Sequence, residues 1–340
     1  DMQQGKYTEA EQRLKKLRAS DPCSLAIASA QIQLNIKLEK SQEALKVCDE
    51  LVNNLKNSSA YILRARTYAA LNQKENCLKD LDNAVAIEPE KAQTWMARSD
   101  FFTASGDKEK ALEDIRKALS LDSANPQIQK RAITLLLTSN QPAMISEGKN
   151  IIEQALKTNP DDVELRMYKA NLFLSEGTAP AIENARQILQ KINQDNPEYS
   201  RAWLLRGEIM IKKNQPGDAM DYASRGLAYQ PNDEDLLFLK ARAEAMRSPV
   251  LAVPTLKVLC DLNPNNVEAV AFLANTYVNT NEPAKAVSFL QNILTKCKES
   301  NKRAYNIRLA AAMYIAGSNE EALKKLDSLM AEVPEDTAPL

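Results

Sequence analysis

The chain has 340 residues, a formal net charge of −1 and no histidine. A near-neutral chain without a recurring basic face lacks the electrostatic footprint of a nucleic-acid-binding protein. The absence of histidine removes the commonest general base and the commonest metal ligand, and no apolar run approaches the roughly 20 residues that a membrane-spanning helix needs. We therefore expect neither nucleic-acid binding nor membrane insertion by this segment.

The cysteines and glycines give no sign of a chemical site. The five cysteines are odd in number and have no close pair, which is unlike a disulfide framework or a zinc site: they are Cys23, Cys48, Cys77, Cys260 and Cys297. They are expected to be small buried packing residues in a reducing compartment, which favours a cytoplasmic over a periplasmic location. With only 8 glycines the chain has no phosphate-cradling loop motif. No catalytic residue, metal or cofactor is expected, and the chain is not expected to be an enzyme.

A repeat dominates the chain. A proline or its replacement recurs every 33 to 37 residues, at Pro22, Lys56, Pro89, Ser123, Pro160, Pro197, Pro231, Pro264, Lys298 and Pro334. A fixed period of this length indicates supersecondary units that bury their apolar faces only by stacking on their neighbours. Residues 1–340 are therefore predicted to form a single array.

The unit from Ser58 to Glu90 shows the pattern most clearly. Counted from Ser58, small residues occupy position 8 (Ala65) and position 20 (Cys77). Apolar residues between them follow helical spacing, and a break with Gly or Asn divides the unit into helix, turn and helix. Position 8 is small down the chain, with Ala65, Ser99, Ala170, Gly207, Ala241, Ala274 and Ala310. Small side chains at this position let two helices cross closely.

In chain order, residues 1–24 match only the second helix of a unit. Full units are predicted to begin near residues 25, 58, 92, 126, 163, 200, 234, 267 and 303, which gives about 19 helices in all. Because the chain opens inside a unit and closes where the next would begin, both ends are expected to be cut from a longer protein.

Three units depart from the pattern. Three extra residues in the units from 126 and 163, near Gln141 to Glu147 and Gly177 to Ala181, predict longer loops in the middle of those units. The unit from 234 carries Pro249 and Pro254 where its second helix is expected to start. Because an interior proline costs roughly 3 kcal/mol, this helix is predicted to be shortened or kinked.

The pattern resembles the tetratricopeptide repeat (TPR) family over essentially the whole chain. The aromatic at position 4 (Trp95, Trp203), the small residues at 8, 20 and 27, and Pro at 32 carry the resemblance. It implies an all-α fold, a right-handed superhelical solenoid of antiparallel helix pairs whose concave surface is lined by the first helix of each pair. The peptide-carboxylate clamp of some members is not matched here, since Lys130 and Arg131 lack the partner residues in the neighbouring units.

An apolar set at the expected inner positions is the candidate binding site. Either it forms a groove for a partner segment or some of its members pack between helices. With its polar neighbours, the predicted partner-binding set is Met167, Tyr168, Asn171, Leu204, Leu205, Glu208, Ile211, Phe238, Arg242, Phe272 and Asn275, and Leu174, Leu239 and Val278 share the apolar pattern. Charges that alternate between units, such as Glu208 and Arg242, predict ion pairs between neighbouring first helices.

These residues predict a non-catalytic scaffold that binds an extended or helical segment of a partner protein on the concave surface. Two alternatives remain open. The array can be the TPR region of a larger enzyme or of a cell-envelope or exopolysaccharide secretion protein, or it can self-associate as a homo-oligomer.

Overall fold

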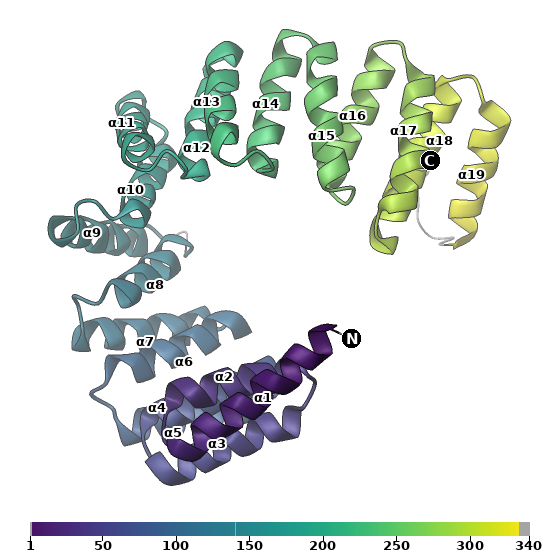
Figure 1. Cartoon of the computed structure of the whole chain (residues 1–340). Coiled ribbons are helices and arrows are strands. Elements are labelled where there is room, and N and C mark those ends of the chain that lie inside the picture. The colour runs from purple at the N-terminus through teal and green to yellow at the C-terminus, as the bar shows by residue number, and fades with distance from the viewer. Residues whose placement is uncertain (1, 140, 333–340) are drawn as a thin grey trace. The chain divides into compact units, whose positions relative to one another are not determined.

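The computed structural model describes residues 2–139 and 141–332, and within them it contains nineteen α-helices and one short 3₁₀ helix. The chain divides into two compact units, residues 1–168 and 169–340. Within each unit, successive helices run antiparallel and follow one another in chain order (Figure 1). The all-α array of helix pairs expected from the sequence is confirmed.

The first unit holds α1 (Met2–Ser20), α2 (Leu25–Lys37), α3 (Ser41–Leu55), α4 (Ser58–Ala70), α5 (Lys74–Ile87), α6 (Ala92–Ser105), α7 (Lys108–Leu121), α8 (Pro126–Leu137) and α9 (Pro142–Thr158). The unit boundary lies within α10 (Val163–Glu176).

The second unit holds α11 (Ala179–Asp195), α12 (Ser200–Lys212), α13 (Pro216–Tyr229), α14 (Glu234–Arg247), the 3₁₀ helix η1 (Pro249–Ala252), α15 (Val253–Leu262), α16 (Val267–Asn279), α17 (Pro283–Lys296), α18 (Glu299–Ile315) and α19 (Asn319–Glu332). The even-numbered helices from α2 to α18 are called first helices below, and their odd-numbered partners second helices.

The turn between a first and a second helix uses the left-handed backbone region, which favours Gly and Asn. Positive φ angles occur there at Glu39, Asn72, Gly106, Asn214, Asn281 and Gly317. Gly177 adopts a positive φ in the turn between α10 and α11 as well. The Gly or Asn break in the sequence pattern thus marks these turns, except the one at Glu39.

The linker between consecutive repeats is fixed by the residue at position 4 of the following first helix. The indole Nε1 of Trp95 donates a hydrogen bond to the carbonyl of Pro89 at 2.7 Å, and Trp203 does the same to Pro197 at 2.7 Å. The linker proline thus ends one helix pair, and its carbonyl anchors the next.

Small residues at position 8 allow the close helix packing that the sequence predicts. Ala65, Ala170 and Ala241 are at most 1% exposed, and a Cβ added to Gly207 would lie 2.3 Å from Cδ2 of Leu239. The core of each unit is a chain of such contacts between successive helices rather than one central core.

The three extra residues in the repeats that start at 126 and 163 lengthen helices, not loops. Both α9 and α11 have 17 residues, whereas α5, α7 and α13 have 14. Proline is compatible with the first helical turn because its missing N–H has no partner there in any case. Pro142 and Pro180 therefore lie within the first turns of longer helices, and the prediction of longer loops is wrong.

The predicted disruption near Pro249 and Pro254 is confirmed. The stretch forms the four-residue η1 and then α15, which has only 10 residues. Each proline lies in the first turn of its own helix, so neither removes an interior hydrogen bond. The predicted start of the last repeat differs from the structure, because α18 begins at Glu299 rather than near residue 303.

Candidate functional site

In the second unit, the predicted site residues lie on α12, α14 and α16. Leu204, Leu205, Glu208, Ile211, Phe238, Arg242 and Phe272 are half-buried, and Asn275 and Asn171 (on α10) are exposed. Leu204 and Ile211 pack at the edge of the core around Trp203. The half-buried residues pack along the face formed by α12, α14 and α16, and part of their surface stays accessible.

Two contacts link neighbouring first helices on this face. A carboxylate oxygen of Glu208 lies 2.5 Å from Nη1 of Arg242, with the side chains about one third exposed. The rings of Phe238 and Phe272 meet edge to face, with centroids 6.0 Å apart, which is a favoured aromatic geometry. The ion pair predicted between these helices is confirmed, and the apolar residues contact one another as well as solvent.

Two residues of the apolar set cannot meet a partner. Met167 is 5% exposed and Leu239 is 1% exposed, so both pack between helices, which is the second of the two alternatives, and the prediction that Met167 belongs to the partner-binding set is wrong. Successive helical residues point about 100° apart, so a small error in register exchanges core and surface positions. Tyr168 is half-buried, and its hydroxyl is 2.8 Å from the hydroxyl of Thr134.

The first unit has a charged hollow on its first-helix face. It has a volume of about 290 Å³ and is lined by Asp100, Thr103, Gln127, Lys130, Arg131, Thr134, Leu135, Glu164 and Tyr168. Lys130 pairs with Glu164 at 2.5 Å and with Asp162 at 3.0 Å, and Arg131 pairs with Asp100 at 3.0 Å. Both basic residues already have carboxylate partners, which agrees with the absence of a carboxylate clamp.

An apolar hollow adjoins the charged one. It has a volume of about 220 Å³ and is lined by Ala65, Arg66, Ala69, Cys77, Leu81, Ala97, Asp100, Phe101 and Ala104. Asp100 lines both hollows. Burial raises the pKa of Asp100, and Arg131 and Arg66 oppose that rise. A carboxylate thus lies where apolar surface on α4 and α6 meets charged surface on α6, α8 and α10.

Sequence reasoning missed these hollows, although two signals pointed to them. Arg66 and Asp100 carry opposite charges at position 9 of consecutive units, and Lys130 and Arg131 stand together in the next unit. The hollows depend on how far apart the helices lie, which no residue pattern specifies.

Three family models match the chain in consecutive stretches. A tetratricopeptide repeat model matches residues 58–91, the model described as "Cytochrome c-type biogenesis protein H TPR domain" matches 80–199, and another tetratricopeptide repeat model matches 179–243. The chain belongs to the tetratricopeptide repeat family. No catalytic family was found, and a search of curated proteins gave no match.

Several solved structures of TPR proteins are similar to parts of the chain. One is a tetratricopeptide repeat protein from Parabacteroides merdae, with a TM-score of 0.47 and 19% identity over 71% of this chain and 94% of that one. Another is a thermophilic TPR protein of Thermus thermophilus, with a TM-score of 0.40 and 22% identity over 51% and 93%. A third, YrrB, is described as a TPR protein with an unusual peptide-binding site, with a TM-score of 0.45 and 19% identity over 58% and 99%.

Two features are absent from the described residues of this TPR protein. Among them, no group of three or more Cys, Asp or Glu side chains is arranged to hold a metal ion. In the same residues, no helix combines the length and the apolar character needed to cross a membrane.

Proposed function

We propose that this TPR protein is a non-catalytic scaffold that holds a segment of a partner protein against its first helices. TPR arrays are generally protein-interaction modules, which supports the proposal at the level of the family. The observation that carries it is the pair of adjoining hollows in the first unit, which share Asp100 on the face formed by the first helices.

The two hollows differ in the chemistry that they offer a peptide. The apolar hollow beside Phe101 can take an aliphatic side chain, because burying such a group is favourable by about 1.5–3 kcal/mol. The charged hollow offers Lys130, Arg131 and Glu164, whose ion pairs are partly exposed and can exchange for contacts with a partner. A segment with an apolar side chain next to polar ones fits an apolar hollow that adjoins a charged one. In the second unit, Leu204 and Phe238 offer further half-buried apolar contacts.

Site-specific photocrosslinking in the source cells tests where the partner binds. A photoreactive amino acid replaces Thr103, which is exposed in the charged hollow, or Lys117, which is exposed on the second helix α7. We expect a specific crosslinked protein from position 103 and none from position 117. Crosslinks from 117 alone would contradict the proposal, and a crosslink between two copies of the chain would replace the partner with self-association.

Substitutions then separate the two units. Ala69→Glu places a charge in the apolar hollow of the first unit. The double variant Leu204→Glu, Phe238→Glu places two charges among the half-buried apolar residues of the second unit. Leu323→Glu is the control, because Leu323 is 55% exposed on the second helix α19 and belongs to neither set of residues. Loss of the crosslinked partner with Ala69→Glu, at unchanged helicity, supports the first-unit hollows. Equal retention by all three variants would reject both faces.

A second, more specific role is favoured by the match of residues 80–199 to the cytochrome c-type biogenesis family model. We propose that the scaffold serves cytochrome c-type biogenesis. Deletion of its gene is expected to lower covalently bound haem in c-type cytochromes, measured by haem staining of denaturing gels, and the intact gene should restore it. Normal haem staining would reject this role while leaving the scaffold proposal intact.

A further inference from the structure

In two repeats of the first unit, the arginine at position 7 joins two aspartate carboxylates. Arg98 donates Nε and Nη2 to the two oxygens of Asp114, sixteen residues later, and Nη1 to Asp82, sixteen residues earlier, at 2.8–2.9 Å. Arg64 repeats the arrangement with Asp80 and Asp49 at 2.7–2.8 Å. In both repeats each of the three guanidinium nitrogens donates a hydrogen bond to a carboxylate.

Arg206 occupies the same position in the repeat that starts at α12, but neither carboxylate is there. Sixteen residues earlier the chain has Gln190, and sixteen residues later it has Tyr222. Among the described residues, Arg206 makes no ion pair, and its one side-chain hydrogen bond, from Nη1 to Asn193 Oδ1, is long at 3.4 Å. Its Nε has no hydrogen-bond partner in the part of the chain that the structure describes.

The unpaired guanidinium is nevertheless buried. Arg206 is only 8% exposed, and its Cζ lies 4.1 Å from the ring centroid of Tyr222 and 5.1 Å from that of Trp203. Cation–π contacts stabilise the position of the charge but supply no hydrogen-bond acceptor. The long contact with Asn193 is the one acceptor of this buried charge among the described residues, and a buried charge with so little compensation is costly.

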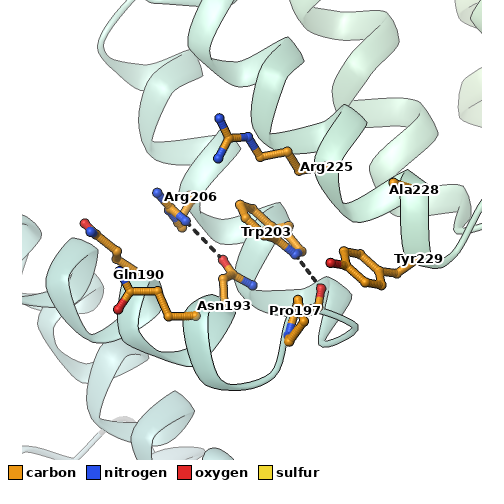
Figure 2. Close-up of a pocket in the computed structure, with 9 residues that line it drawn as sticks. Gln190, Asn193, Pro197, Trp203, Arg206, Arg225, Ala228 and Tyr229 are labelled. Carbon is orange, nitrogen blue, oxygen red and sulfur yellow. Dashed lines mark hydrogen bonds between the residues drawn. The ribbon is translucent and has the colours of Figure 1, made fainter.

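A pocket opens beside Arg206, with a volume of about 480 Å³. Its lining includes a second cation, Arg225, the amides of Gln190, Asn193 and Gln194, and the exposed ring of Tyr229. Figure 2 shows the contact of Arg206 with Asn193 and the hydrogen bond from Trp203 to Pro197 at its wall. The pocket lining contains no Asp or Glu. Within the described part of the chain, the one ion pair of Arg225 is an exposed pair with Asp221 at 2.9 Å, which constrains it little.

We propose that this pocket binds a carboxylate group of a ligand, which contacts the Nη atoms of Arg206 on the side where Asp82 contacts Arg98. The chain itself provides the precedent, since both equivalent arginines bind carboxylates there. A carboxylate matches the fork of a guanidinium, and the neighbouring amides and Arg225 can bind its remaining oxygens. The ligand is either a free organic acid or an acidic side chain of a protein.

Tryptophan fluorescence provides a direct test, because the chain has only two tryptophans. In a Trp95→Phe variant, Trp203 at the pocket wall is the remaining tryptophan. Sodium succinate, titrated at constant ionic strength, is expected to give a saturable change with half-saturation in the millimolar range. Adding Arg206→Gln is expected to weaken binding at least about tenfold, because it removes charge-assisted hydrogen bonds.

Two further variants keep the test informative if Arg206→Gln proves unstable. Gln190→Asp supplies an internal carboxylate where Asp82 stands beside Arg98, and we expect it to weaken succinate binding about tenfold and to raise the unfolding midpoint. Arg247→Gln removes an exposed positive charge on α14 and should leave binding unchanged.

A synthetic peptide with two aspartates, compared with its asparagine counterpart, identifies the source of the carboxylate. Tighter binding of the aspartate peptide than of succinate assigns the pocket to a protein segment, and equal or weaker binding assigns it to a free acid. No saturable response to either probe, or a response that Arg206→Gln and Gln190→Asp both leave unchanged, would overturn the proposal.

Discussion

Leu239 fills the space that Gly207 leaves by having no side chain. The two residues face each other on α14 and α12, and a Cβ on Gly207 would lie 2.3 Å from Cδ2 of Leu239 and 3.3 Å from its Cγ. Both atoms belong to a side chain that is 1% exposed and cannot swing into solvent. The approach of these two first helices therefore depends on one missing methyl group.

Gly207→Ala is expected to lower stability by about 1–3 kcal/mol, because it overpacks this contact. Gly217→Ala is the matched control, since nothing lies within 4 Å of the added Cβ in the first turn of α13. There the better helix propensity of alanine is expected to stabilise by up to about 1 kcal/mol. Guanidinium chloride denaturation followed by circular dichroism measures both, and equal effects would refute the packing argument.

The two carboxylates of Arg98 are expected to differ in their contribution to stability. Asp114 is 4% exposed in its side chain and Asp82 is 54% exposed. Asp114→Asn removes the buried bidentate partner of the half-buried Arg98, at a cost of about 3 kcal/mol, whereas Asp82→Asn should cost less than about 1 kcal/mol. Denaturation midpoints of the two variants test the order, which a larger loss for Asp82→Asn would reverse.

Alkaline pH is expected to destabilise the second unit through Cys260. Burial raises the pKa of this thiol from 9.0 to about 12. Between these values the unfolded chain loses the proton that the folded chain keeps, so stability falls as pH rises from about 9, by up to about 1.4 kcal/mol per pH unit. Cys260→Ala should flatten the decline measured by denaturation between pH 9 and 11. Cys23→Ala should not, because Cys23 is exposed, contrary to the expectation that every cysteine is buried.

The Phe238–Phe272 contact is expected to contribute a coupling energy of about 0.5–1.5 kcal/mol. A double-mutant cycle of Phe238→Leu and Phe272→Leu, read from unfolding free energies, measures it. Asn275→Ala is the control, since Asn275 is exposed on the same helix as Phe272. Additive effects of the two phenylalanine changes would mean that the rings serve only a partner and not the fold.

The helices of this chain were predictable because the same few constraints recur in every repeat. Small residues at position 8, left-handed turn residues such as Gly106, and linker prolines such as Pro197 each act within a few residues of their place in the sequence. The lengthening of α9 and α11 was not predictable, because proline fits both a loop and a first helical turn. The hollows beside Asp100 were also hidden, since their size depends on spacing between helices.

The pocket at Arg206 could be predicted in part from the sequence. Arginine with aspartate sixteen residues later occurs at Arg64 and Arg98, and the break in this pattern at Tyr222 is visible without a structure. What the residues alone do not show is that the guanidinium remains buried after its partner is lost, because that depends on how Trp203 and Tyr222 pack around it.

Asp82, Arg98 and Asp114 lie on α5, α6 and α7, so one guanidinium ties the end of one repeat to both helices of the next. In an array whose cooperativity comes from nearest-neighbour coupling, such a tie makes adjacent repeats open together. Around α12 the tie is missing, and we expect amide hydrogen exchange to reveal earlier local opening there than around α6. An anion held by Arg206 would supply the missing link, so that occupancy of one small pocket would control how far an opening event spreads along the repeats.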